Sequence, residues 1–231
     1  MHIVKIIFVL LFFITSCEAM NFSDRDANAD ATYRVTFVAN WTKSRFSTNF
    51  PEGNDHFSGL VGATHNSRVN FWREGKQASK GIEIVAETGS KTTFINEIEI
   101  QKSNNVAEFL LSGGGLSFGK GNGNISFEFD INRPHPLVTL ISMLAPSPDW
   151  FVGVHDLSLL NSRGQWVESL EVNLPLYDAG TDLGRVFTSA DEDSNGVISL
   201  LTSRPGDTNF VNGKHRNNAR YVGKFIFERI K

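Results

Sequence analysis

Short segments in which apolar and polar residues alternate recur along most of this chain, and they constrain the fold more than any other feature. In "YRVTFVA" (residues 33–39), Tyr33, Val35 and Phe37 alternate with polar side chains. Alternation puts every second side chain on the same face, as in a half-buried β-strand. The segments 125–131 and 221–230 show a similar pattern. Five further segments are predicted as strands: 92–101, 106–112, 137–145, 151–160 and 165–174.

Turn-rich pieces such as "GKGNGN" and "NRPHP" separate these segments, which favours an antiparallel arrangement. One segment, residues 78–89, departs from the pattern because Ile82, Val85 and Ala86 follow a helical spacing and Gly89 is placed to end a helix. The sequence therefore predicts an all-β fold, an antiparallel β-sandwich of about eight strands with one short helix and long loops.

Composition narrows the class of protein. The chain has 231 residues, 40% of them hydrophobic and 19 of them Phe, which is enough for one sizeable core. No repeat or linker divides residues 32–231, so we expect one domain there. A formal net charge of −3 gives no electrostatic basis for gripping a polyanion, and nucleic acid is excluded as an expected partner.

The first 19 residues have the character of a signal peptide, since a basic start precedes an apolar run too short to span a bilayer. Two processing routes stay open. "ITSC" resembles a lipoprotein site with cleavage before Cys17, whereas "CEA" allows ordinary cleavage after Ala19. Residues 20–31 are polar and predict a tether. We expect a protein that is secreted or held on the cell envelope, with a lipid on Cys17 as its only membrane attachment.

Asp149 adjoins an apolar run in "SPDWFVGV" and needs a structural reason for its charge. It could simply cap a turn after Pro148. However, "LYDAGTDLG" carries two more acids, Asp178 and Asp182, around a flexible glycine. Carboxylates that converge repel one another unless a cation lies between them.

A hairpin would bring these acids together. We expect a strand from Asp149, a tight turn at "NSRGQ" and a returning strand that ends at Asp178. Three carboxylates at one rim suit Ca²⁺, which takes six to eight oxygen ligands. Mg²⁺ requires a stricter geometry, and zinc would call for Cys or paired His ligands. The predicted metal ligands are Asp149, Asp178 and Asp182.

"SPDWFVGV" followed by "YDAGTDLG" resembles the spondin amino-terminal domain, and so do residues 49–66 and 78–89. The resemblance covers roughly residues 32–190. It implies an antiparallel β-sandwich with a bound calcium ion, held by acids that match Asp149, Asp178 and Asp182, in proteins of the extracellular matrix that support cell adhesion.

Departures from the family pattern limit what can be carried over. Animal relatives have cysteines within the domain and further modules beside it, whereas this chain has neither, which puts in doubt partners such as integrins. The stretch from Asp191 onward also matches less well. We expect a single-domain, bacterial member of the family.

Four other patterns have competing explanations. "DEDSNG" (residues 191–196) begins like an EF-hand loop, but Thr202 stands where a bidentate Glu is required, so an acidic turn that could hold a weak second ion is preferred. His56 and His65 could serve a hydrolase, or could make structural hydrogen bonds in a long loop. Glu97 and Glu99, on one face of an expected strand, could mimic a glycosidase pair or be solvated.

The tryptophans could form a sugar platform, although they belong more often to a core; Trp150 is the one to watch, because it adjoins the expected ion. The glycine-rich segment 112–124 predicts a hairpin loop. The sequence thus favours a non-catalytic, monomeric, calcium-binding module whose partner is an extracellular protein or a glycan. A glycan-binding lectin-like module and, behind it, an extracellular hydrolase remain the alternatives.

Overall fold

The structure is a computed structural model that describes residues 30–231. The predicted signal peptide, Cys17 and residues 20–29 of the predicted tether lie outside the described residues. Within 30–231, no helix has both the length and the apolar character needed to cross a membrane.

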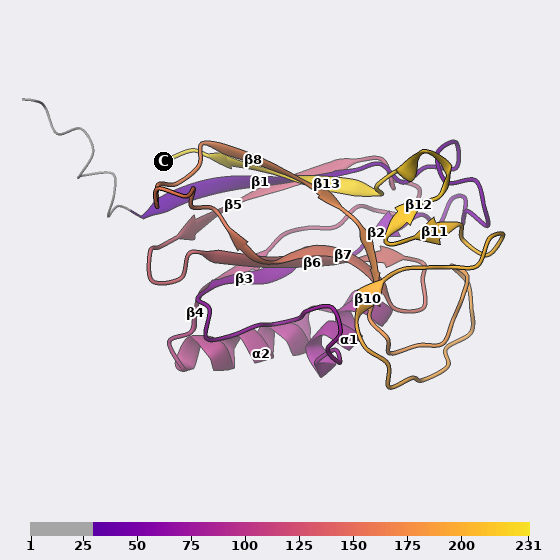
Figure 1. Cartoon of the computed structure of the whole chain (residues 1–231), viewed down its shortest axis with the longest axis horizontal. Helices are drawn as coiled ribbons and strands as arrows, with labels where there is room; N and C mark the ends of the chain where they lie inside the picture. Colours follow the sequence, from indigo (N-terminus) through magenta and orange to yellow (C-terminus); the bar gives the residue numbers. More distant parts are fainter. Residues whose placement is uncertain (1–29) are drawn as a thin grey trace, which may run out of the picture.

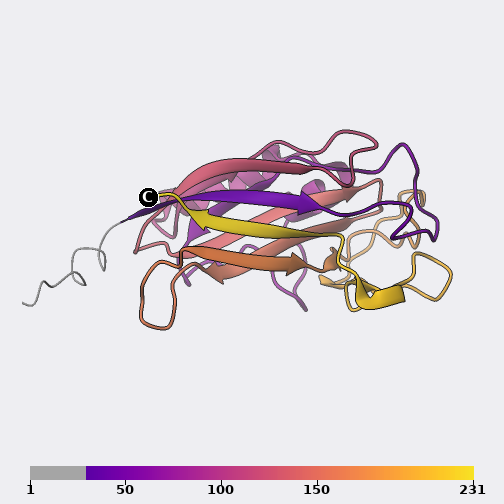
Figure 2. The same ribbon diagram turned by 90° about the horizontal axis from the view of Figure 1, so that it is seen from above.

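Two antiparallel sheets stack face to face (Figure 1). The smaller sheet has four strands in the order β5-β1-β13-β8. Their bounds are β1 Ala31–Ala39, β5 Asn124–Ile131, β8 Ser169–Leu174 and β13 Gly223–Arg229. Strand β1 begins one residue before the expected domain start, and it lies centrally between β5 and β13 (Figure 2).

The larger sheet runs in the order β10-β9-β7-β6-β3-β4, with β2 paired to β6. The bounds are β2 His56–Phe57, β3 Val61–His65, β4 Ala107–Ser112, β6 Leu137–Ala145, β7 Trp150–Ser158, β9 Leu176–Asp178 and β10 Ser199–Leu200. A small ribbon of β11 (Phe210–Val211) and β12 (Lys214–His215) and a 3₁₀ turn (Asn217–Ala219) follow. The predicted β-sandwich is confirmed, with several short strands beyond the expected eight.

The main core lies between the two sheets. Tyr33, Val35 and Phe37 of β1 point inward and are buried, together with Phe225 and Phe227 of the neighbouring β13. Each such side chain contributes roughly 1.5–3 kcal/mol of burial free energy. The period-two pattern of β1 therefore identified the inward face correctly.

Two helices cover the outer face of the larger sheet, α1 (Lys80–Thr88) and α2 (Thr92–Ser103) (Figure 1). Helix α1 is the predicted one: Ser79 caps its start, and Gly89 ends it in the left-handed conformation at φ 71°. The helices also explain β6, which reads as a continuous apolar run because it is buried on both faces.

Helix α2 corrects the prediction of a strand at 92–101. The alternation in "INEIEI" suggested a strand, but Phe94 and Ile98 are the buried pair, one helical turn apart, and Ile100 is exposed. Packing of Phe94 and Ile98 against α1 and the sheet outweighs the apparent strand pattern. The fold thus has two helices on one face instead of one.

Two predicted hairpins are also wrong. β7 and β8 lie in different sheets, and the chain crosses between the sheets through the 159–168 loop. After β8, Pro175 interrupts the strand, and β9 returns to the larger sheet to pair with β7. Likewise the glycine-rich segment 112–124 joins β4 of one sheet to β5 of the other.

The two ends of the described domain pair with each other. The Thr32 amide donates to the Lys231 carbonyl at 3.1 Å, and the Ile230 amide donates to the Thr32 carbonyl at 2.9 Å. Both ends lie on the side of the sandwich away from the long loops after β9 (Figure 1).

Candidate metal site

Asp149 and Asp178 meet at one edge of the larger sheet. Asp149 immediately precedes β7 and Asp178 ends β9, and the register pairs Trp150 with Asp178. The Ala179 amide also donates to the Asp149 carbonyl at 3.1 Å. The neighbourhood predicted from sequence is thus present, although the crossing through β8 creates it and not a simple hairpin.

The Asp149 carboxylate is fully buried and only half satisfied. Its Oδ2 accepts hydrogen bonds from the amides of Thr181 (2.7 Å) and Asp182 (3.1 Å). Its Oδ1 is buried and has no hydrogen-bond partner among the described residues. Asp149 therefore does more than cap the local turn after Pro148, because it fastens a loop 32 residues further along the chain.

The other two acids hold the same loop in a tight shape. Asp178 Oδ1 accepts from the Gly180 amide at 2.8 Å, and Asp182 Oδ1 accepts from the Gly184 amide at 2.6 Å. Gly180 adopts φ 75°, and a Cβ there would approach the Val197 amide nitrogen to 2.6 Å. Only glycine fits at position 180, and its backbone conformation lets the loop bend between Asp178 and Asp182.

No positive side chain among the described residues forms an ion pair with these carboxylates. The pKa of Asp149 is raised to about 7, chiefly by burial and also by the charges of Asp178 and Asp182, while hydrogen bonds from the Thr181 and Asp182 amides oppose the rise. Burial also raises the pKa of Asp178, and the Asp182 charge adds to that rise. Among the described residues, none of the three acids makes an ion pair with Lys, Arg or His.

The donor set suits a hard cation. Within residues 30–231, no group of three or more Asp, Glu, His or Cys side chains is arranged closely enough to hold a metal ion. The oxygens nevertheless include the orphaned Asp149 Oδ1, in a neighbourhood with two further carboxylates and no nitrogen or sulfur ligand. Carboxylate oxygens of this kind are the ligands that Ca²⁺ takes.

Sequence reasoning missed a pocket beside these acids. It has a volume of about 450 Å³, and its walls include Asp178, Asp182, Arg185 and Arg204. It also missed Glu87 of α1. Burial raises the pKa of the Glu87 carboxyl, and a hydrogen bond with Thr181 offsets only part of that rise. Arg185 follows Asp182 by three residues in the same loop, whereas only the tertiary fold brings Arg204 and Glu87 to this rim, so no local motif could have revealed those two.

The EF-hand pattern at 191–196 lies in the loop between β9 and β10, and no helix brackets it. Asp193 instead forms an isolated β-bridge with Asp182. The structure shows there an extended acidic loop segment, not a turn, whose Ser194 and Gly196 amides donate to the carbonyls of Thr181 and Gly180.

His56 and His65 do not converge on a site. His65 belongs to β3 and not to a long loop, and it is fully buried, with its Nε2 2.8 Å from Thr139 Oγ1. His56 Nδ1 lies 2.6 Å from the Asn54 carbonyl, and its ring packs on Phe118. Both make structural hydrogen bonds, and the buried Thr139 is inaccessible as a nucleophile.

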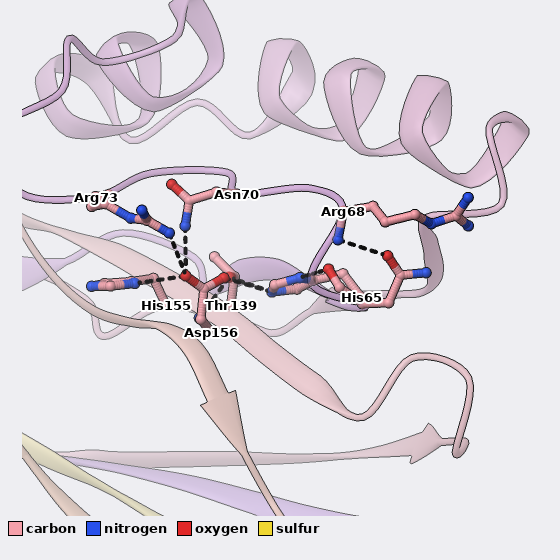
Figure 3. Close-up of polar contacts among 8 residues, drawn as sticks. His65, Arg68, Asn70, Arg73, Thr139, His155 and Asp156 are labelled. Carbon is pink, nitrogen blue, oxygen red and sulfur yellow. Dashed lines mark hydrogen bonds and ion pairs between the residues drawn. The ribbon is translucent and has the colours of Figure 1, made fainter.

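A polar network extends from His65 to Asp156 of β7 (Figure 3). Asp156 Oδ2 accepts from Asn70 Nδ2 at 2.6 Å, and lies 3.2 Å from His155 Nδ1 and 3.6 Å from an Arg73 guanidinium nitrogen. His65 Nε2 is 3.8 Å from Asp156 Oδ1. From the 66–78 loop, the Asp156 carboxylate thus receives a hydrogen bond from Asn70 and lies beside the guanidinium of Arg73. These contacts hold the loop against the sheet.

Glu97 and Glu99 are on α2 and serve different partners. Glu97 accepts from the Gly81 amide and from the Ser79 hydroxyl, both at 2.6 Å, and so caps the start of α1. Glu99 pairs with Lys102 at 3.0 Å. The glycosidase interpretation is therefore wrong for this pair.

All four tryptophans belong to the interior, as expected for core residues: Trp41, Trp72, Trp150 and Trp166. Trp150 packs against Phe187 at a ring distance of 5.3 Å and is 1% exposed. The tryptophans therefore do not form an exposed sugar platform.

The fold and rim define a class of protein: a β-sandwich with helices on one face and a cluster of acids where β7 and β9 meet. Residues 31–212 match the family model described as Spondin_N, and the chain belongs to that family.

Curated relatives agree with this assignment. Human spondin-2 is 35% identical over 169 residues, covering 71% of this chain and 49% of the relative. Rat spondin-1 is 31% identical over 204 residues, covering 87% of this chain and 25% of the relative. The chain thus spans half or less of the length of these relatives.

Proposed function

We propose that this chain is a calcium-stabilised recognition module that acts outside the cell or on its envelope, in adhesion. Membership of the spondin family supports the extracellular role. The observation that carries the calcium proposal is the buried Oδ1 of Asp149, which has no hydrogen-bond partner among the described residues, beside two further carboxylates that form no ion pair with any described residue.

Asp149, Asp178 and Asp182 would hold the ion, with backbone carbonyls and water completing its oxygen shell. Bound there, calcium would neutralise the repulsion among the acids and tie the start of β7 to the loop after β9. An ion that binds only the folded state stabilises it by about 2.7 kcal/mol when its concentration is 100 times the dissociation constant.

The test combines calorimetric calcium titration with thermal unfolding. We expect chelator to lower the melting temperature by about 5–10 °C, which corresponds to 2.7 kcal/mol for a domain of this size. Asp178→Asn should abolish the binding heat and most of that shift. Asp130→Asn is the matched control, because Asp130 is an exposed acid on β5.

The proposal fails if wild-type protein binds no calcium and its melting temperature is the same with and without chelator. Equal calcium binding by Asp178→Asn and Asp130→Asn would place the ion elsewhere.

A further inference from the structure

The pocket beside the acids is formed by the loops that follow β9 and β10. Its lining carries three acids: Asp178 and Asp182 of the candidate metal site, and Asp207 of the loop after β10. Its volume of about 450 Å³ falls in the usual range of small-ligand sites, about 300–1,000 Å³. A bound ligand would therefore touch the residues proposed to hold calcium.

Two arginines line the same pocket without a partner. Arg185 and Arg204 are exposed, and neither guanidinium makes an ion pair or hydrogen bond with any described residue. Most other arginines here are engaged; Arg34, for example, pairs with Glu128 at 2.7 Å. Guanidinium groups present a planar fork that matches a carboxylate, so this pair offers a grip for an anionic group.

The ligand must satisfy the acids and the arginines of the lining at once. This step rests on the proposed function, because the bare carboxylates of Asp178 and Asp182 would repel an anion and a calcium ion between them would attract one. Calcium also accepts further oxygens from a ligand. A ligand with a carboxylate and several neutral oxygens in a compact unit meets both requirements.

The rest of the lining suits a carbohydrate. Leu183 and Val197 are exposed aliphatic side chains on the same pocket, and they offer an apolar surface for the C–H face of a sugar ring. Ser194 adds a hydroxyl that makes no hydrogen bond with any described residue. The volume exceeds what one acidic amino-acid side chain would fill, which favours a sugar acid over a single Asp or Glu of a protein partner.

We propose that this pocket binds an acidic saccharide, with a uronic-acid carboxylate held by Arg185 and Arg204 and ring hydroxyls facing the calcium-bearing wall.

The test is calorimetric titration of the whole domain with tetrasaccharides that contain glucuronate or galacturonate, in excess calcium. Their neutral counterparts, with glucose or galactose in place of the acid, are the matched ligands. We expect a uronate ligand to bind at least about tenfold more tightly than its neutral counterpart, and the double variant Arg185→Gln/Arg204→Gln to lose that preference. Arg163→Gln, an exposed arginine in the turn between β7 and β8, should bind like wild type.

Calcium-dependent melting is measured on the same samples, so the two proposals can fail separately. The arginine variant should keep the full calcium shift, because its substitutions leave the acids intact. A calcium shift without any uronate binding overturns the saccharide proposal alone. It is likewise overturned if neutral sugars bind equally well, if the arginine variant binds like wild type, or if only an acidic peptide binds.

Discussion

A carboxylate lies at each end of β7, and the surroundings of the two carboxylates differ in how far they compensate the negative charge. Asp156, near one end, is surrounded by the donors and cations of Asn70, Arg73 and His155. Asp149, at the other end, is fully buried and meets only backbone amides and two more acids. Described side chains compensate the charge of Asp156, whereas none compensates that of Asp149, and the calcium proposal rests on this difference.

The largest expected effect comes from removing the uncompensated charge. In chelator at pH 8, Asp149→Asn should be more stable than wild type by up to about 4 kcal/mol, because a carboxyl pKa raised from 3.8 to about 7 corresponds to that penalty on the ionised form. An amide oxygen can still accept from the Thr181 and Asp182 amides. Chemical denaturation measures the difference.

The pH dependence follows from the same shift. Because the folded pKa of Asp149 is raised, its stabilising contribution is full below pH 3.8 and is lost as the pH rises through about 7. The advantage of Asp149→Asn should therefore shrink steadily from pH 7 to pH 4. If the stability advantage of Asp149→Asn is unchanged at pH 4, it comes from side-chain packing and not from the removed charge.

The second effect is local protection by calcium. The amides of Thr181 and Asp182, which bind Asp149, should exchange with solvent up to about 100-fold more slowly when calcium is 100 times its dissociation constant. Amides next to Asp156 should not change. Hydrogen–deuterium exchange resolved to peptides measures both, and uniform protection of the two ends would erase the distinction between them.

A smaller effect is expected at the compensated end. Asp156→Asn should lower stability by about 1 kcal/mol, because the charge that faces Arg73 and His155 disappears while a hydrogen-bond acceptor for Asn70 remains. Asn also tolerates the positive φ of 50° at this position. Its calcium shift should equal that of wild type, and a reduced shift would show that the two ends are coupled.

The smallest expected effect is on the stability of the fold at acidic pH. Burial lowers the pKa of His65, which lies beside Asp156, so its contribution to stability is present above pH 6.5 and is lost as the pH falls through the folded pKa. In saturating calcium, the stability of His65→Gln should decline less between pH 7 and pH 5 than that of wild type. Parallel unfolding curves for the two proteins would contradict this.

How far the sequence predicts this fold depends on which interactions decide each segment. The alternation in β1 and β5 reports burial of one face, the apolar run of β6 reports burial of both, and all three strands appear where expected. The segment 92–101 carries both a strand pattern and the helical pair Phe94 and Ile98, and only packing against α1 selects the helix.

The candidate site shows the same division. The spacing of Asp149, Asp178 and Asp182 around a glycine was enough to predict that they share a neighbourhood. The path of the chain from β7 through the other sheet to β9 was not predicted, although Pro175 indicated that a strand could not continue through that position. Arg185 follows Asp182 by only three residues, whereas Arg204 could not be predicted, because it reaches the pocket from the loop after β10 that only the finished sheet brings alongside.

The pairing of Thr32 with Ile230 and Lys231 has a practical consequence for any molecule joined to this domain. Both ends of the described domain lie at the pole opposite the loops that carry the acids and the arginines (Figure 1). A tag or bead attached beyond either end of residues 30–231 would therefore leave those loops pointing away from the attachment point and accessible from solution.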